Sequence, residues 1–139
     1  MTGVMDERYR ELVPRFPLWE KTKDLVEQFL DIMLNYRQSG HPGGSRSKLH
    51  ALIVTLLGGI MRWDIRHPEK RFGDRFVLAA GHTVPMIYAT LALLNEALRA
   101  KHEQTGDSRY LVPGGAQRML TWEDLAMLRR NRGLSKPLR

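Results

Sequence analysis

The sequence predicts an α/β fold that is mostly helical and contains one strand. Apolar residues recur at helical spacing in four separate segments. One short apolar run, residues 75–80, is bounded by charge and by Gly81, which predicts a buried strand that turns into a helix. A lone strand leaves its backbone groups unpaired. We therefore expect further strands, from sequence that follows this segment or from a partner chain.

The first two predicted helices flank a glycine-rich turn. Apolar spacings of three and four predict a helix over residues 18–38, with prolines before it and Gly40 after it. Residues 39–45 read Ser-Gly-His-Pro-Gly-Gly-Ser, which predicts a loop that can turn sharply and approach a ligand closely. A second helix is predicted from about Ser47, where the apolar period resumes.

The second half of the chain continues the helical pattern. A polar connection over 65–73 precedes the strand, and a third helix is predicted over 83–101 with its proline in the first turn. Residues 102–115 are predicted to form a loop. Thr121 and Asp124 have the spacing of a capping box, which predicts the start of a last helix.

We expect these elements to belong to one incomplete domain. Its predicted parts are an extended lead-in over residues 1–17, a core over 18–132 and a tail over 133–139. Three tryptophans are predicted to be packing anchors: Trp19, Trp63 and Trp122.

Composition narrows the classes of function. The 139 residues are 42% hydrophobic and 27% charged, as in ordinary soluble domains, and the absence of cysteine excludes disulfides and cysteine-zinc sites. The N-terminus lacks a secretory signal, so a cytoplasmic location is expected. The longest apolar stretch, residues 51–61, is about half the ~20 residues that cross a bilayer, so we expect no membrane span.

The chain is basic, with 22 Lys and Arg against 15 Asp and Glu and a net charge of +7. These charges are scattered, except for a cluster between Arg129 and Arg139 that has no interleaved aromatic residues. No nucleic-acid motif accompanies the cluster, so a nucleic-acid partner is not predicted, whereas a basic surface that faces phosphate stays open.

Two histidines are the candidates for chemistry. His41 lies in the glycine-rich turn, and His82 lies between the end of the strand and the start of a helix, where open α/β sheets place ligand groups. Free N–H groups at that helix N-terminus would favour a phosphate or carboxylate beside His82. An imidazole there can donate a hydrogen bond or shuttle a proton near neutral pH. A loop histidine taken alone is more often structural.

Together these segments resemble the N-terminal part of transketolases. That family has a Gly-His-Pro-Gly loop, an Asp-Arg-Phe-Val-Leu strand and a Gly-His turn in the order of residues 39–45, 74–78 and 81–82 here. The resemblance covers about residues 25–94, and residues 121–130 resemble the family's next helix. It implies a thiamine-diphosphate-binding fold, a parallel sheet with flanking helices. It also implies transfer of a two-carbon ketol unit from a ketose phosphate to an aldose phosphate.

The resemblance implies roles for four residues. Gly40 and His41 would bind the sugar phosphate, with His41 as the catalytic residue that assists proton movement, and Gly81 and His82 would lie near the cofactor's diphosphate. The implied cofactors of the complete protein are thiamine diphosphate and Mg²⁺ or Ca²⁺. The implied partner is a second copy in a homodimer, or a companion pyrimidine-binding domain or subunit.

The family's metal motif, Gly-Asp-Gly followed by Asn, is absent. Residues 106–108 with Asn131 imitate its spacing, but the polar residues 101–105 before them cannot form the buried strand that the motif requires. We therefore predict no metal ligand in this chain and no activity from the chain alone. The glutamate that activates the cofactor belongs, in the family, to a later domain.

Some features have more than one interpretation. Arg46 and Lys48 stand where many transketolases have small or apolar residues, so they either alter substrate choice or point to solvent. Three other histidines show no metal-ligand spacing and are predicted to lie on the surface: His50, His67 and His102.

Two alternative functions also stay open. The long stretch between Leu94 and Leu120 resembles the decarboxylating subunit of homodimeric pyruvate dehydrogenase, which implies a 2-oxo-acid substrate. The other alternative is a non-enzymatic helical binding module derived from the transketolase family.

Overall fold

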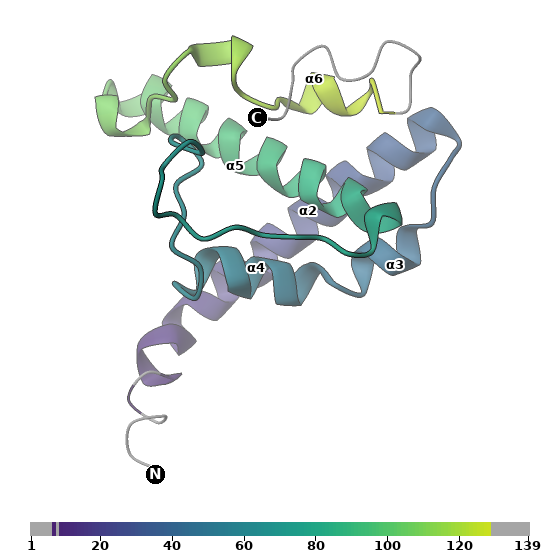
Figure 1. The fold of residues 1–139 in the computed structure, drawn as a ribbon, viewed down its shortest axis with the longest axis horizontal. Coiled ribbons are helices and arrows are strands. Elements are labelled where there is room, and N and C mark those ends of the chain that lie inside the picture. The colour runs from purple at the N-terminus through teal and green to yellow at the C-terminus, as the bar shows by residue number, and fades with distance from the viewer. Residues whose placement is uncertain (1–6, 8, 129–139) are drawn as a thin grey trace.

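The computed structural model describes residue 7 and residues 9–128, which form a helical assembly (Figure 1). Its α-helices are α2 (Phe16–Arg37), α3 (Pro42–Arg46), α4 (Leu49–Leu57), α5 (Val84–Thr105) and α6 (Trp122–Leu125). Short 3₁₀ turns lie at Val13–Arg15, Gly81–Thr83, Ser108–Tyr110 and Gly115–Gln117. None of the helices in this part of the chain has the length and apolar character that a bilayer span requires.

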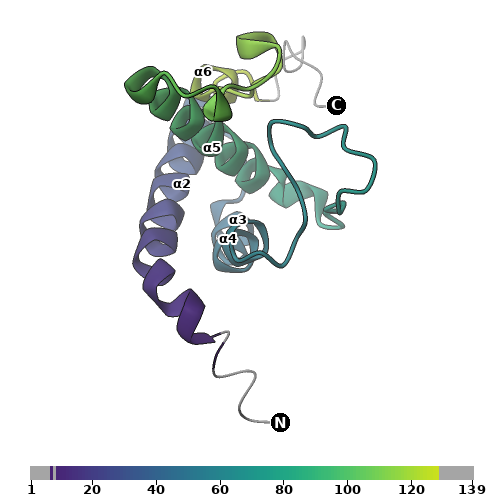
Figure 2. The same cartoon turned by 90° about the vertical axis from the view of Figure 1, so that its left-hand side faces the viewer.

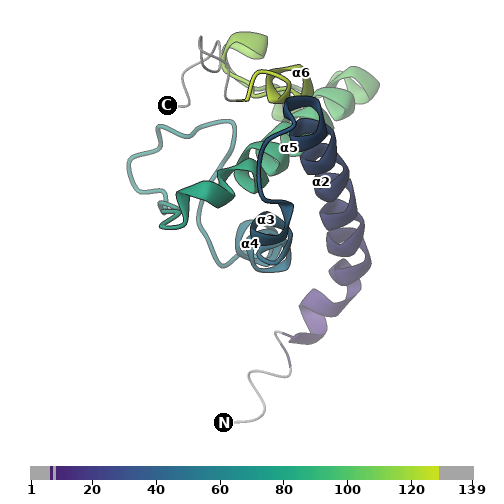
Figure 3. The ribbon, with the colours of Figure 1, turned by 90° about the vertical axis from the view of Figure 1, so that its right-hand side faces the viewer.

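The hydrophobic core lies where α2 packs against α4 and α5. Val26 and Leu30 of α2 are fully buried there, as is Leu49 of α4. Their positions on α2 follow the helical period, because residues three or four apart share one face. Figure 3 shows α2 along the outer edge of the molecule with α4 and α5 on one side of it. The predicted first helix is therefore confirmed, with bounds of 16–37 in place of 18–38.

The predicted strand over residues 75–80 is wrong. Residues 7 and 9–128 contain no strand, and within them no backbone hydrogen bond joins residues 75–78 to another segment. Phe76 and Val77 are 42% and 86% exposed, and Figure 2 shows the chain after α4 looping away from the helices. A strand forms only when a second strand pairs with its backbone, and the described chain offers no such partner.

Three other boundaries differ from the predictions. Residues 9–12 and 13–17, expected to be extended, are helical. Pro42–Arg46, expected to be part of a loop, is a short helix with proline in its first turn, where the missing N–H costs nothing. α5 continues to Thr105, beyond the predicted end at residue 101, and stops at Gly106 in the left-handed conformation.

The C-terminal part confirms one sequence signal. The capping box of Thr121 and Asp124 is present at the start of α6, and the Thr121 N–H donates to Asp124 Oδ2 at 2.9 Å. The predicted core residues 129–132 and the tail over 133–139, with the basic cluster, lie outside the described residues.

Trp19, Trp63 and Trp122 were predicted to anchor packing, and the structure agrees for the first two. Trp19 is buried in the core, and the Trp63 Nε1–H donates to the Leu56 carbonyl at 2.8 Å. Trp122 is 51% exposed on α6, so the prediction that it anchors packing is wrong.

Candidate functional site

The first Gly-His segment follows the C-terminus of α2. Gln38 ends the helix in the left-handed conformation, with φ 47°, and Gly40 has φ 132°. This second value is one that residues with a side chain rarely adopt, so glycine is required at this point of the turn. His41 follows as the N-cap of α3, and its side chain is exposed.

The second Gly-His segment lies in the 3₁₀ turn Gly81–Thr83, directly before α5. His82 is exposed there, whereas the next residue, Thr83, is fully buried. Two hydrogen bonds from Thr83 to the Ala80 carbonyl, from its N–H at 2.9 Å and its hydroxyl at 2.8 Å, close the turn. The imidazole of His82 therefore projects from a backbone that is locally fixed.

The structure brings the two segments together, although they are about 40 residues apart in the sequence. The hydroxyl of Ser45, a fully buried residue, donates to the Thr83 carbonyl at 3.4 Å. A Cβ on Gly44 would lie 3.2 Å from Thr83 Cγ2 and 3.6 Å from His82 Nε2. Glycine at position 44 thus allows the first turn to approach His82 closely. The sequence predicted two separate glycine turns, and it did not predict this contact.

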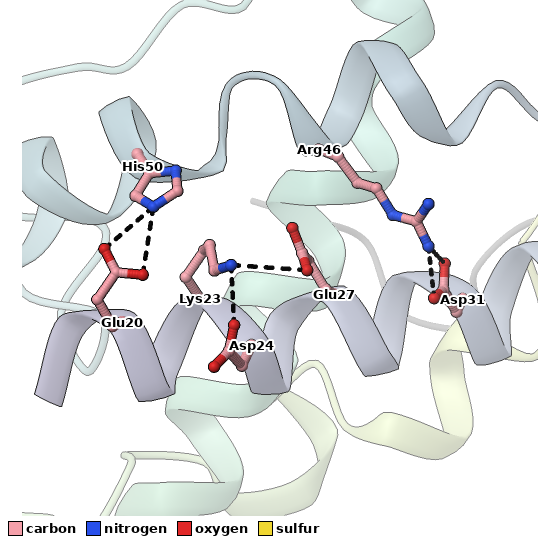
Figure 4. Close-up of polar contacts among 7 residues, drawn as sticks. All are labelled: Glu20, Lys23, Asp24, Glu27, Asp31, Arg46 and His50. Carbon is pink, nitrogen blue, oxygen red and sulfur yellow. Dashed lines mark hydrogen bonds and ion pairs between the residues drawn. The ribbon is translucent and has the colours of Figure 1, made fainter. Parts of the chain in front are cut away.

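Arg46 and Lys48 hold the first turn in place. The Arg46 guanidinium donates to both carboxylate oxygens of Asp31 on α2, at 2.6 Å for Oδ2 (Figure 4). The Lys48 ammonium donates to the Gly44 carbonyl at 2.9 Å. The Arg46 side chain is 44% exposed, as the solvent interpretation expects, and Lys48 is half-buried. Both side chains also tie the glycine turn to a neighbouring helix or to backbone.

A second contact in Figure 4 also joins α2 to the helix that follows the turn. His50 Nε2 on α4 lies 3.1 Å from Glu20 Oε1, and both side chains are exposed. His50 therefore lies on the surface, as predicted, but bridges two helices there. Across residues 7 and 9–128, no group of three or more His, Cys, Asp or Glu side chains is placed to hold a metal ion.

The N-terminus of α5 offers fewer donors to an anion than the sequence suggested. The N–H groups of Thr83 and Val84 donate to the carbonyls of Ala80 and Gly81, and Pro85 has no N–H. These three positions consequently present no free backbone donor, which corrects the expectation that they would. The exposed imidazole of His82 is one group at this turn that can meet an incoming anion.

Asp107, which imitates part of a metal motif, is engaged in a local structure. Its carboxylate caps a 3₁₀ turn by accepting from the Arg109 N–H at 2.8 Å and from Arg109 Nε at 2.8 Å. The Arg109 side chain, followed by its backbone N–H, lowers the pKa of Asp107 from its usual value. The preceding residues 101–105 form the end of α5, so they are not the buried strand that a metal motif needs. Asn131 lies outside the described residues.

A hollow of about 990 Å³ lies between residues 61–76 and the middle of α5. Asn95 lines it and is 5% exposed; its Nδ2 donates to the Leu120 carbonyl at 3.0 Å, while its Oδ1 is buried without a partner. A buried polar atom of this kind is costly unless something pairs with it. Sequence reasoning missed Asn95, although one amide within an apolar helix face was the available signal.

Asp64 fixes the segment that forms one side of this hollow. Its carboxylate accepts from the Arg66 backbone N–H at 3.0 Å and from the Arg66 guanidinium at 2.8 and 2.9 Å, and Arg66 also donates to the Arg109 carbonyl. The Arg66 side chain, with a smaller contribution from its backbone N–H, lowers the pKa of Asp64.

We expect Asp64→Asn to lower the free energy of unfolding at pH 7 by about 1–2 kcal/mol, because it weakens hydrogen bonds to a charged group. The folded-state pKa of Asp64 lies below the unfolded value of about 3.9, so the stabilisation is complete above that value and is lost as the pH falls through the folded-state pKa. Urea denaturation at pH 7 and in acid tests this. Glu11→Gln, at an exposed position, is the control. An equal loss at both pH values would contradict the assignment.

Comparisons with known proteins give one partial similarity. No family model matches the chain, and no solved structure matches it. A transketolase from Aquifex aeolicus (strain VF5) is 36% identical to it over 63 residues, which make up 45% of this chain and 9% of that protein. The match therefore spans less than a tenth of the relative's length. It shows that part of this chain is similar to part of a transketolase.

Proposed function

We propose that this chain forms one wall of a thiamine-diphosphate site in an enzyme of the transketolase type, and that further polypeptide completes the site. The observation that carries the proposal is the contact between the two Gly-His segments, in which Gly44 lies against His82 and Thr83. The similarity to a transketolase over 63 residues supports it. The reaction proposed is transfer of a two-carbon ketol unit from a ketose phosphate to an aldose phosphate.

The two histidines would have different tasks. His82 would donate a hydrogen bond to the diphosphate, and His41 would donate to an oxygen of the sugar and move a proton there. Thiamine diphosphate, when bound, supplies the nucleophile that cleaves the ketose. Both imidazoles are exposed on turns whose backbone is held by Asp31, Thr83 and their hydrogen bonds. Such fixed placement reduces the ordering needed when a ligand binds.

The described residues fit the organic part of the cofactor better than its metal. They offer imidazole donors, but within residues 7 and 9–128 no cluster of metal-ligating side chains occurs. The residues that bind the metal would therefore belong to the completing polypeptide. That polypeptide would be a continuation of this chain, a companion subunit or a second copy.

The segment before His82 supports a requirement for more polypeptide. Residues 75–78 are without backbone partners in the described chain, and Val77 is 86% exposed. Pairing with an added strand would satisfy these backbone groups and cover the apolar side chains. It would also order the peptide that leads directly into the His82 turn.

A helical binding module is the second candidate, and the core observed around Leu30 favours it. Among the described residues that core joins α2, α4 and α5 without a sheet, so the helices can pack without a completed cofactor site. A module of this kind would bind a partner and catalyse nothing.

Two activity measurements distinguish part of a thiamine-diphosphate enzyme from a helical binding module: one on the isolated chain, and one on a transketolase into which the matching residues of this chain are grafted. We expect the isolated chain, with thiamine diphosphate and Mg²⁺, to turn over neither a ketose phosphate nor pyruvate. A graft in which this chain's matching residues replace the corresponding 63 residues of the Aquifex aeolicus transketolase is expected to retain ketol transfer. A graft that folds but has no activity would favour the binding module. Turnover by the isolated chain would contradict the proposed incompleteness.

A further inference from the structure

The hollow between residues 61–76 and the middle of α5 has a wall with hydrogen bonds of its own. The Asp74 N–H donates to the Arg62 carbonyl at 2.8 Å, and the Arg62 N–H donates to Asp74 Oδ2 at 2.7 Å. These bonds close residues 62–74 into a compact loop whose ends meet, which Figure 2 shows standing off from the helices. Inside it, the N–H groups of residues 67, 70 and 73 donate to the carbonyls of residues 64, 67 and 70. The wall is therefore in place before any ligand enters.

One polar atom of this hollow lacks a hydrogen bond. Asn95 lines the hollow from α5 and is 5% exposed. Its Nδ2 group donates to the Leu120 carbonyl at 3.0 Å, which fixes the orientation of the amide, because the reversed amide would bring two oxygen atoms together. Asn95 Oδ1 is then the available end of the amide, and it has no partner among the described residues. A group that pairs with Oδ1 must therefore be a hydrogen-bond donor.

Positive charge gathers at the rim of the hollow. The lining includes five Arg or Lys side chains and three carboxylates. Each carboxylate already has an arginine partner, at 2.8 Å for Asp64, 3.2 Å for Asp74 and 3.6 Å for Glu69. Within the part of the chain that the structure describes, three cations of the lining have no carboxylate partner and are exposed: Lys70, Arg71 and Arg75. The rim can therefore accept an anion that carries more than one negative charge.

The remaining lining is largely apolar and includes aromatic rings. Trp63 and Leu91 are half-buried, and Phe76 is 42% exposed. A planar ring packs favourably against such side chains, whereas the hydroxyls of a sugar would be left without partners there. A hollow of about 990 Å³ is large enough for a small organic ligand. The features together select a planar ring that carries one N–H donor and is joined to a charged group.

We propose that the hollow binds a nucleoside monophosphate whose base carries an exocyclic amino group, such as AMP. The amino group donates to Asn95 Oδ1, the base packs between Phe76 and Leu91, and the phosphate lies at Lys70 and Arg71. A phosphate monoester carries nearly two negative charges at neutral pH, so it matches a group of cations better than a single carboxylate does. Arginine also binds phosphate oxygens through two parallel hydrogen bonds.

This site is separate from the two Gly-His segments. Asn95 follows Thr83, the N-cap of α5, by twelve residues, which is about 18 Å along the helix axis. Neither His41 nor His82 lines the hollow. The inference therefore does not rest on the proposed function, and the two can be tested independently.

Isothermal titration calorimetry of the purified chain with AMP tests the proposal. We expect a dissociation constant of about 10–100 μM, as for an efficient ligand of this size. Purine riboside 5′-monophosphate lacks the amino group, so it should bind at least about tenfold more weakly, because Asn95 Oδ1 then stays unpaired. Ribose 5-phosphate, which keeps the sugar and the phosphate without the base, should bind more weakly still.

Three variants test the residues that the proposal uses. Asn95→Leu should weaken AMP binding at least about tenfold and reduce the preference for AMP over purine riboside 5′-monophosphate. Lys70→Ala and Arg71→Ala should each weaken AMP binding about three- to tenfold and make it less sensitive to salt. Lys101→Ala is the matched control, because it removes an exposed cation of α5 that does not line the hollow. Circular dichroism checks that the helices persist, and the two rim variants alter exposed side chains, so they test the site even if Asn95→Leu does not fold.

Several results would overturn the proposal. One is the absence of heat from AMP binding at about 2 mM, far above the expected dissociation constant. Equal affinities for AMP and purine riboside 5′-monophosphate, or unchanged binding in both Asn95→Leu and Lys70→Ala, would also overturn it. His82→Ala should leave the dissociation constant for AMP unchanged. AMP binding that depends on His82 would place the nucleotide at the Gly-His segments and contradict a separate site.

Discussion

Gly40→Ala is expected to lower the free energy of unfolding by about 2–4 kcal/mol. Two costs add at this position. The backbone has φ 132°, a conformation that strains any residue with a side chain, and the new Cβ would lie 2.5 Å from Leu34 Cδ2. Leu34 is 8% exposed within the core, so its side chain cannot move aside without disturbing its neighbours.

Gly43→Ala is the matched control, because it adds the same methyl group two residues after His41. No heavy atom lies within 4 Å of that Cβ, and the residue is inside α3 with ordinary backbone angles. The free energy of unfolding of the Gly43→Ala variant should therefore stay unchanged or rise slightly. Urea denaturation of both variants makes the measurement. Equal stabilities would mean that Gly40 serves ligand binding alone and that the turn is not constrained by its conformation.

The sequence predicted the long helices well because their signals are local. The apolar period of α2 and the capping box of Thr121 and Asp124 lie within a few residues of the structures that they specify. The strand over 75–80 failed for the opposite reason. Its apolar residues suit a strand, but a strand depends on a partner distant in sequence or in another chain, and local composition cannot supply one.

The short helix α3 shows the same division between local and distant causes. Glycines at positions 43 and 44 favour a loop, yet Pro42 starts a helical turn that Arg46 holds to Asp31. That ion pair joins residues fifteen positions apart, so spacing alone did not reveal it. The position of Trp122 on the surface was likewise decided by how α6 packs, and not by its side chain.

The candidate site was only partly readable from the sequence. The order of the two Gly-His segments was visible, and their roles came from resemblance to transketolases. Their contact through Gly44 and Ser45 required the fold, because it joins segments that only the packing of α3 against the start of α5 brings together. The sequence did offer one amide within an apolar helix face at Asn95, but only the fold shows that the amide is buried and that its oxygen has no partner.

The largest functional effects are expected at the two histidines, measured in the active graft. His41→Ala should lower kcat by about 10²–10⁴-fold, the range for loss of a group that moves a proton, with little change in the affinity for thiamine diphosphate. His82→Ala should lower kcat and also weaken the binding of thiamine diphosphate, because it removes a hydrogen-bond donor to the diphosphate. His50→Ala is the control, since that exposed side chain contacts Glu20 and lies outside the glycine turns.

The central claim is that the two Gly-His segments form part of one thiamine-diphosphate site. Its most direct test is to measure kcat for ketol transfer and Kd for thiamine diphosphate in these three variants of the graft. We expect His41→Ala to lower kcat alone, and His82→Ala to lower kcat and also to raise the Kd for thiamine diphosphate. His50→Ala should change neither value. If His41→Ala and His82→Ala both keep the kinetics and cofactor affinity of the unmodified graft, the two Gly-His segments do not form part of the site.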